Sequence, residues 1–306
     1  MTSPGSAPGA PQPQGSCGFI ILDKPAGLTS HDCVARIRRR YGLKRVGHGG
    51  TLDPAVTGVL PLALGSATRL LPYLNGTKAY RGVVQLGLRT DSDDLGGSVL
   101  ERRPLPPLSL HALETALNAF RGPILQRPPQ VSAVHVQGER AYARARRGEL
   151  SDLKEREVTI ERLELLGWDA GQGLLELEVR CGAGTYIRSL ARDLGDALGC
   201  GGALAKLRRT EALGFDLSAA VSLEDLEAEP PPPPLAPLRA LGQYPTLMLE
   251  PAELVGWRCG RRLAGPPDLH EGQVVVVLKP DGNLAGMARA VAEGWLQPRL
   301  VLEAKG

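Results

Sequence analysis

A run of prolines late in the chain limits what this sequence can fold into. Residues 229–237 have the sequence EPPPPPLAP. Proline has no backbone N–H and fixes φ, so such a run cannot continue a helix or occupy the centre of a sheet. We therefore predict a stiff, extended, proline-rich linker over 229–246. It separates a long segment, 17–228, from a final module, 247–306, of about 60 residues, which is small but large enough to fold.

Apolar patterns in the long segment predict both strands and helices. Thr29 followed by Asp32 is typical of a helix capping box. Residues 60–74 are mostly apolar, and we expect part of this segment to be helical. Apolar runs and alternation predict strands at 18–22, 80–88, 157–166 and 174–180, and helical spacing predicts helices at 110–120 and after the glycines of CGAGTYIR.

The two ends of the chain differ in character. Residues 1–16, MTSPGSAPGAPQPQGS, predict a disordered tail and carry no secretory signal. Near the other end, residues 273–290 predict a β-hairpin, because a Pro-Asp-Gly-Asn turn separates two apolar runs. No apolar run is long enough to span a membrane, so we expect no membrane association.

The cysteines argue against a disulfide framework. They are five, an odd number, they are dispersed, and no two form a C-x-x-C pair. Such usage also argues against structural zinc and fits a reducing compartment. We therefore predict a cytoplasmic protein without a bound metal. The cysteines are Cys17, Cys33, Cys181, Cys200 and Cys259.

Positive charge is concentrated although the net charge is only +3. One cluster lies within 36–45 and the other within 140–147. Arginines grouped in this way are candidate phosphate contacts, whereas a solvated helix face is the simpler explanation of either cluster alone. The arginines of the second cluster are Arg140, Arg144, Arg146 and Arg147.

A single acid, Asp53, lies in the glycine-rich stretch VGHGGTLDPAVTGVLP, five residues after His48. Asp-Pro in a loop is usually turn chemistry, in which the side chain bonds amides just downstream. The glycines also permit a bulky ligand to approach the backbone around the carboxylate. The stretch is therefore either a structural turn or a loop that holds a reacting group.

Arg188 follows the glycines of CGAGTYIR, near the start of a predicted helix. A cation at that end does not complement the helix dipole. We expect either an arginine retained to pair with an acid or an ordinary surface arginine.

Taken together, VGHGGTLDPAVTGVLP, KAYRG, GTYIR and LRRTEALG resemble, in order and separation, the TruB family of tRNA pseudouridine synthases. The resemblance runs from about residue 17 to about residue 226 and includes DKPAGLTSHD and QRPPQVSAVHVQGERAYARAR. It implies an α+β pseudouridine synthase fold with a mixed, mainly antiparallel central sheet. It also implies an RNA-binding insertion at about 122–150 and a small C-terminal PUA-like β-barrel over 247–306.

The resemblance implies an isomerase that converts the uridine of the TΨC loop of tRNA to pseudouridine. The target base is flipped out, uracil is detached from C1′, rotated, and rejoined through C5. No cofactor is implied. The implied partner is the T arm of tRNA, bound by a monomer that needs no other protein.

The resemblance also assigns roles to residues. Asp53 would be the essential carboxylate, either adding to the nucleotide or deprotonating C2′, and Arg188 would be its counter-charge, able to form two parallel hydrogen bonds. Tyr80 would stack on uracil and help to remove the C5 proton. His48 would support base flipping. The remaining substrate-binding positions would be Tyr186, Leu207 and Lys24, and Arg140, Arg144, Arg146 and Arg147 would meet the RNA backbone.

Two positions depart from the family pattern, and three alternatives remain. Gly49 replaces the usual threonine and His135 a common lysine. The protein could instead be a guide-RNA-dependent pseudouridylase subunit, or a tRNA-folding chaperone whose catalysis is incidental. A metal-dependent phosphohydrolase would need acids beside Asp53; the nearest set, Asp91, Asp93 and Asp94, is better explained as a solvated turn.

Overall fold

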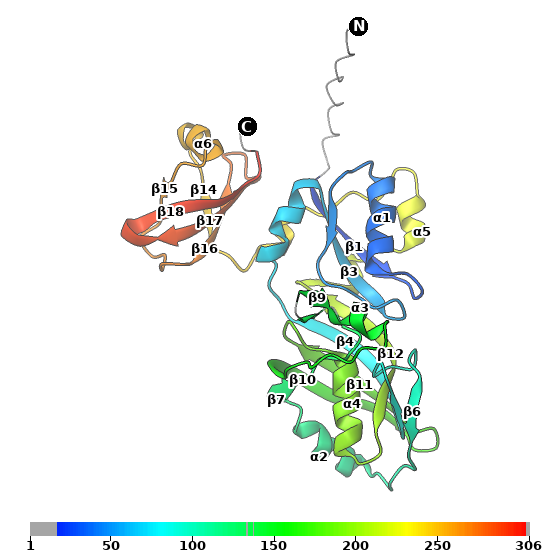
Figure 1. The fold of residues 1–306 in the computed structure, drawn as a ribbon. Coiled ribbons are helices and arrows are strands. Elements are labelled where there is room, and N and C mark those ends of the chain that lie inside the picture. Colours follow the sequence, from blue (N-terminus) through cyan, green and yellow to red (C-terminus); the bar gives the residue numbers. More distant parts are fainter. Residues whose placement is uncertain (1–16, 133, 137, 304–306) are drawn as a thin grey trace.

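The computed structural model describes residues 17–132, 134–136 and 138–303; the tail expected at 1–16 lies outside them. A nine-stranded sheet forms the larger part, and a five-stranded sheet forms a separate lobe (Figure 1). The larger sheet runs in the order β1-β3-β12-β4-β11-β10-β7, with β2 on β3 and β13 on β12. Its strands are β1 (Gly18–Lys24), β2 (Val46–His48), β3 (Thr57–Leu64), β4 (Lys78–Leu86), β7 (Gly122–Gln126), β10 (Arg156–Asp169), β11 (Leu174–Cys181), β12 (Gly202–Ala212) and β13 (Phe215–Asp216).

Strand direction in this sheet is mixed but mainly antiparallel, as predicted. β3 and β12 run parallel, with Arg209 opposite Gly58, and every other pairing is antiparallel. Two small hairpins lie outside the sheet, β5 (Leu88–Thr90) with β6 (Val99–Arg102), and β8 (His135–Val136) with β9 (Glu139–Arg140). The chain therefore has the predicted α+β architecture.

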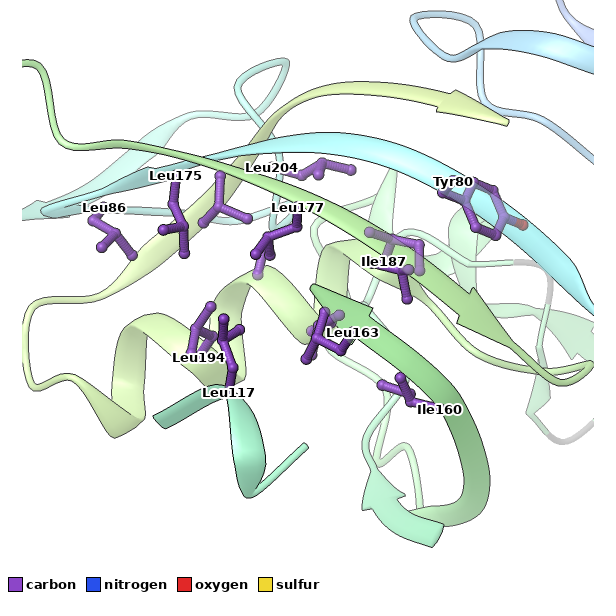
Figure 2. Packing of buried hydrophobic residues seen from close by; sticks show 14 of the residues in the cluster. Tyr80, Leu86, Leu117, Ile160, Leu163, Leu175, Leu177, Ile187, Leu194 and Leu204 are labelled. Carbon is purple, nitrogen blue, oxygen red and sulfur yellow. The ribbon is translucent and has the colours of Figure 1, made fainter. Parts of the chain in front are cut away.

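Helix α4 (Ile187–Ala197) covers one part of the sheet together with α2 (Leu110–Asn118). Apolar residues recur at helical spacing on α4, so one side of the helix is buried. Figure 2 shows Ile187 and Leu194 of α4 packed with Leu177 of β11 and Leu117 of α2. Burial of this stripe orients the first turn of α4, where Arg188 lies.

Helix α1 (Ser30–Arg40) packs on the other part of the sheet with α5 (Leu223–Glu227). The predicted capping box is present: Thr29 and Asp32 bond each other's backbone amides. The expectation that 60–74 is partly helical is confirmed by the 3₁₀ helix η1 (Gly65–Tyr73), whereas residues 60–64 belong to strand β3, which the sequence did not predict. β3 is buried along nearly its whole length, so its sequence lacks the alternation that marks a half-buried strand.

The five-stranded sheet of the final module is curled and has the order β14-β16-β17-β18-β15. The hairpin predicted at 273–290 is β16 with β17, paired antiparallel. Trp257 of α6 (Pro251–Arg258) is buried against it. The strands are β14 (Thr246–Met248), β15 (Leu263–Ala264), β16 (Val274–Leu278), β17 (Leu284–Val291) and β18 (Trp295–Val301).

The proline-rich segment lies against the core. Phe19 and Leu235 exchange two backbone hydrogen bonds of 2.9 and 2.8 Å. The segment then turns into the 3₁₀ helix η3 (Pro237–Ala240), so its second half is not extended. Leu241 is buried in one apolar cluster with Phe19 of β1 and Val276 of β16. This segment therefore joins the two sheets through a shared core.

Within the described part of the chain, no helix is long and apolar enough to cross a membrane.

Candidate active site

Asp53 lies in the loop between β2 and β3, in a tight turn in which the Val56 amide donates to the Asp53 carbonyl, 3.0 Å. The backbone alone closes this turn, and the side-chain carboxylate of Asp53 points toward Arg188. Its Oδ2 lies 3.0 Å from Nη2 of Arg188, and 45% of the side chain remains exposed. Asp53 is thus held by a cation and still open to a ligand.

Arg188 is almost completely buried in the first turn of α4, with 8% of its side chain exposed. Its Nη1 donates to the Ser92 carbonyl, 3.0 Å, and its Nη2 to the Val131 carbonyl, 2.9 Å. Nε lies 3.6 Å from Oδ2 of Asp94. The guanidinium therefore contacts Asp53 through one nitrogen and does not form the expected two parallel hydrogen bonds.

The turn that contains Asp94 braces this arginine. Asp94 accepts hydrogen bonds from Ser92 Oγ and the Gly96 amide, and Asp93 forms an ion pair with Arg192, 2.8 Å. Burial raises the pKa of Asp93. This corrects the expectation of a solvated turn. Across residues 17–132, 134–136 and 138–303, no group of three or more His, Cys, Asp or Glu side chains is arranged to hold a metal ion.

Five of the candidate residues line one cavity of about 240 Å³. β4 contributes Tyr80 and β12 contributes Leu207, while the carboxylate lies on the loop between β2 and β3 and its arginine lies in the first turn of α4. Figure 2 shows Tyr80 on β4 at the edge of the apolar cluster. The five are Asp53, Tyr80, Tyr186, Arg188 and Leu207.

Tyr80 lies directly opposite Arg209 in the pairing of β4 with β12. Burial raises the pKa of the Tyr80 phenol, and the charge of Arg209 and a hydrogen bond to it act in the opposite direction. Arg209 is fully buried, with Nε donating to the Val59 carbonyl at 2.7 Å and Nη2 to the Gly50 carbonyl at 3.1 Å. We did not identify this arginine from the sequence, where its only signal is its place in LRRTEALG.

Arg209 also explains the glycines around Asp53. Gly58 has φ +101°, and a Cβ there would collide with the backbone of Arg209. Gly50, at φ +120°, offers its carbonyl to the guanidinium. These two glycines let β12 approach the Asp53 loop closely. They serve protein packing, whereas the sequence had suggested room for a ligand.

His48 lies in an adjoining cavity of about 590 Å³ that Asp53 does not line. Burial, with contributions from His31 and Arg209, lowers the pKa of His48, so the ring is neutral near pH 7. Its ring lies edge-on to His31 at 5.6 Å, and its buried Nδ1 has no hydrogen-bond partner within the described residues.

Lys24 does not reach either cavity. It is fully buried, and its ammonium donates to the carbonyls of Pro25 (2.8 Å), Leu28 (2.7 Å) and Pro54 (3.2 Å). Three acceptors use all three of its protons. This corrects the expectation of a substrate contact: Lys24 fixes the loop next to Asp53.

Acids within the insertion already pair two of its arginines. Arg147 contacts Glu139 at 2.6 Å and Glu149 at 2.8 Å, and Arg144 lies 3.5 Å from Glu149. Arg146 lies over the ring of Tyr142, 5.4 Å from its centroid, and Arg140 ends β9. A binding role for Arg144 or Arg147 requires these pairs to be exchanged for phosphate.

The other basic cluster borders a separate groove of about 740 Å³ between α1 and α5. Arg36 and Arg39 line it beside Asp32 and Glu227, and Arg40 is paired with Glu229, 2.9 Å. This groove is larger than the Asp53 cavity but holds no Asp53, Tyr80 or Arg188. We therefore place the candidate chemistry in the smaller cavity.

Comparisons with known proteins identify the family. Residues 38–187 match the model of the TruB family pseudouridylate synthase N-terminal domain, and residues 188–230 match the tRNA pseudouridylate synthase B C-terminal domain. A tRNA pseudouridine synthase B of Parasynechococcus marenigrum (strain WH8102) is 62% identical, covering 95% of this chain and 99% of the relative. This chain belongs to the TruB family. A second TruB relative, from Synechococcus sp. (strain WH7803), is 58% identical over 94% of this chain and 98% of its own.

Solved structures agree with this assignment at the level of fold. A Cbf5-Nop10-Gar1 complex matches with a TM-score of 0.73 at 25% identity, covering 96% of this TruB chain and 88% of the matched chain. An H/ACA RNP bound to a substrate RNA containing 2′-deoxyuridine matches with a TM-score of 0.72 at 24% identity, over 94% and 86%. The pseudouridine synthase fold and membership of an isomerase family are therefore established.

Proposed function

We propose that this chain is a stand-alone tRNA pseudouridine synthase that isomerises uridine 55 in the TΨC loop of tRNA. The observation that carries the proposal is the Asp53–Arg188 pair, which opens into a small cavity lined by Tyr80, Tyr186 and Leu207. Near-full-length relatives called tRNA pseudouridine synthase B support the same substrate class.

The cavity suits one nucleoside flipped out of an RNA stack. Flipping costs a few kcal/mol, and contacts with the extruded base offset this cost. Tyr80 and Leu207 offer flat and apolar surfaces to a uracil ring, while the half-exposed carboxylate of Asp53 faces the sugar. His48, a neutral side chain in the adjoining cavity, supports the flipped nucleotide or fills the space that the base leaves in the RNA stack.

The reaction is an isomerisation and needs no outside reactant. Asp53 either adds to the nucleotide or takes the C2′ proton, and the C1′–N1 bond breaks. After rotation C5 bonds to C1′; at this point the bond to Asp53 breaks or, in the second route, C2′ regains its proton. The C5 proton leaves to solvent with help from Tyr80, and N1 gains a proton. Arg188 keeps the Asp53 carboxylate oriented throughout, because its Nη2 lies 3.0 Å from Oδ2 of Asp53 and its guanidinium is fixed by backbone carbonyls.

The rest of the chain would grip the RNA. We propose a catalytic domain over 17–228, with an insertion at about 122–150 that holds the T arm, and a PUA-like RNA-binding domain over 247–306. The enzyme would act in the cytoplasm as a monomer. A guide-dependent role is the principal alternative, and the matched structures include an H/ACA RNP bound to a substrate RNA and a complex of Cbf5 with two other proteins.

The test is tritium release. Purified protein is incubated, without metal or nucleotide, with an unmodified T-arm hairpin that carries uridine tritiated at C5. We expect release by the wild type and at least a hundredfold less, about two orders of magnitude, by Asp53→Asn, which should still bind the hairpin. Binding without release by the wild type would sink the stand-alone function and favour a guide-dependent or RNA-folding role.

A further inference from the structure

Lys78 joins the two cavities. It starts β4, two residues before Tyr80 and on the same face of the strand. Among the residues that line the Asp53 cavity and the His48 cavity, Lys78 is the one shared by both. A ligand that extended from one cavity into the other would pass its ammonium.

Lys78 carries a charge that the protein does not neutralise. Its Nζ and Nη1 of Arg209 lie 3.7 and 3.5 Å from the point where a Cβ on Gly50 would stand. In the described ranges neither cation forms an ion pair with a carboxylate. Burial and the charge of Arg209 lower the pKa of Lys78, because two cations lie close together away from solvent.

The acids near Lys78 and Arg209 already form ion pairs with other arginines. Asp53 is held by Arg188, and Glu211, two residues beyond Arg209 on β12, is paired with Arg180. His48, the titratable group across the second cavity, is neutral near pH 7. The positive charge at the junction is therefore available to an anion that arrives with the substrate.

We propose that the Lys78 ammonium binds the phosphate that links the target uridine to a neighbouring nucleotide. This inference rests on the proposed function, because it assumes that the uracil occupies the Asp53 cavity beside Tyr80. Lys78 and Tyr80 are about 7 Å apart along the strand, a separation of base and backbone within one nucleotide. The anion relieves the repulsion between Lys78 and Arg209 and fixes the register of the RNA.

The test pairs protein variants with RNA variants. In an Asp53→Asn background, which prevents turnover, we compare Lys78 with Lys78→Met, Lys78→Gln and Lys78→Arg. Lys206→Met is the matched control, because Lys206 is exposed on β12 and lines neither cavity. The hairpins carry one neutral methylphosphonate, either 5′ or 3′ of the target uridine.

We expect Lys78→Met and Lys78→Gln to bind the unmodified hairpin about tenfold more weakly at low salt, with a shallower salt dependence. At one of the two linkages, the methylphosphonate should weaken binding to the parent and to Lys206→Met by a similar factor. Binding to Lys78→Met should not change with that methylphosphonate. Lys78→Arg should be as sensitive to it as the parent. Equal sensitivity of parent and Lys78→Met at both linkages would overturn the inference. Tritium release by the wild type, measured separately, decides the proposed function itself.

Discussion

Arg188 shows how a single residue serves both stability and chemistry. Its guanidinium joins Asp53 of one loop, Asp94 of another, and two backbone carbonyls. A planar fork of five N–H donors can reach all four of these acceptors, whereas a lysine ammonium carries only three donors on a single nitrogen. The site therefore depends on the shape of the cation as well as on its charge.

We predict that Arg188→Lys loses at least about a hundredfold in kcat, because Asp53 is no longer oriented. Arg188→Met should in addition destabilise the fold by about 3 kcal/mol, because it leaves Asp94 without its buried counter-charge. Steady-state tritium release and urea unfolding measure the two effects. Arg192→Lys, one turn further along α4, is the control for kcat, and an equal loss there would contradict a specific role for Arg188.

A glycine at position 49, where the resemblance to the family leads us to expect threonine, fits the packing around it. A Cβ at Gly49 would collide with Cδ1 of Leu213, which occupies the space above it. We predict that Gly49→Thr costs about 1–3 kcal/mol through overpacking. In Gly49→Thr combined with Leu213→Ala, part of that cost should be recovered. Urea unfolding of the four proteins gives the coupling energy, and strictly additive effects would show that the two positions do not compete for space.

The pKa of His48 gives a pH prediction. Burial lowers it from the ordinary 6.5, so the folded protein keeps this ring neutral while the unfolded chain protonates it. The unfolded state then binds more protons, and stability must fall as the pH drops below about 6.5. Unfolding at pH 7.5, 6.5 and 5.5 should show a smaller loss for His48→Gln than for the wild type. His111→Gln, exposed on α2, should follow the wild type, and indistinguishable slopes for all three would contradict the prediction.

At the level of elements, the sequence predicted what is decided locally. The capping box at Thr29, the amphipathic α4 and the β16–β17 hairpin have signals within a few residues, and all are present. β3 and β12 were misjudged or missed. β3 is apolar on both faces, and β12 carries bulges and adjacent arginines in place of alternation. Both strands are defined by pairing with partners far along the chain.

The candidate site likewise contains residues that local motifs predicted and residues whose roles depend on contacts between distant segments. The motifs of the resemblance singled out Asp53, Tyr80, Tyr186, Arg188 and Leu207, which the fold gathers at one cavity. The buried Arg209, the brace at Asp94 and the three carbonyls around Lys24 depend on which backbones meet in space. No spacing along the sequence indicates these contacts between distant segments.

The close approach of β3 to β12 yields a prediction at this scale. An alanine at a left-handed position costs about 1–2 kcal/mol from backbone conformation alone. Gly122→Ala, at φ +83° with no atom within 4 Å of the added Cβ, should lose only that amount of folding stability. Gly58→Ala, at φ +101°, must also displace the backbone of Arg209 and should lose clearly more stability in urea unfolding. Equal losses would mean that the two strands can part without penalty.

On the scale of the whole molecule, the two sheets share one core. Leu241, within the proline-rich segment, is buried with residues of both, and polar bonds reinforce the contact. The Arg69 guanidinium donates to the Val301 carbonyl at 2.7 Å, and the Tyr244 hydroxyl donates to the Tyr73 carbonyl, also at 2.7 Å. The final module is therefore fixed relative to the site by packing.

We predict that Leu241→Ala loosens both sheets, whereas Leu263→Ala, the same truncation within the five-stranded sheet, loosens that sheet alone. Each removes a buried leucine and should cost about 2–4 kcal/mol. Hydrogen exchange by mass spectrometry resolves the two cases: peptides of β1 and of β16 should both exchange faster in Leu241→Ala, and only those of β16 in Leu263→Ala. If β1 keeps its protection in Leu241→Ala, the lobes are held by the backbone pairing of Phe19 with Leu235, and the shared apolar cluster contributes little to their coupling.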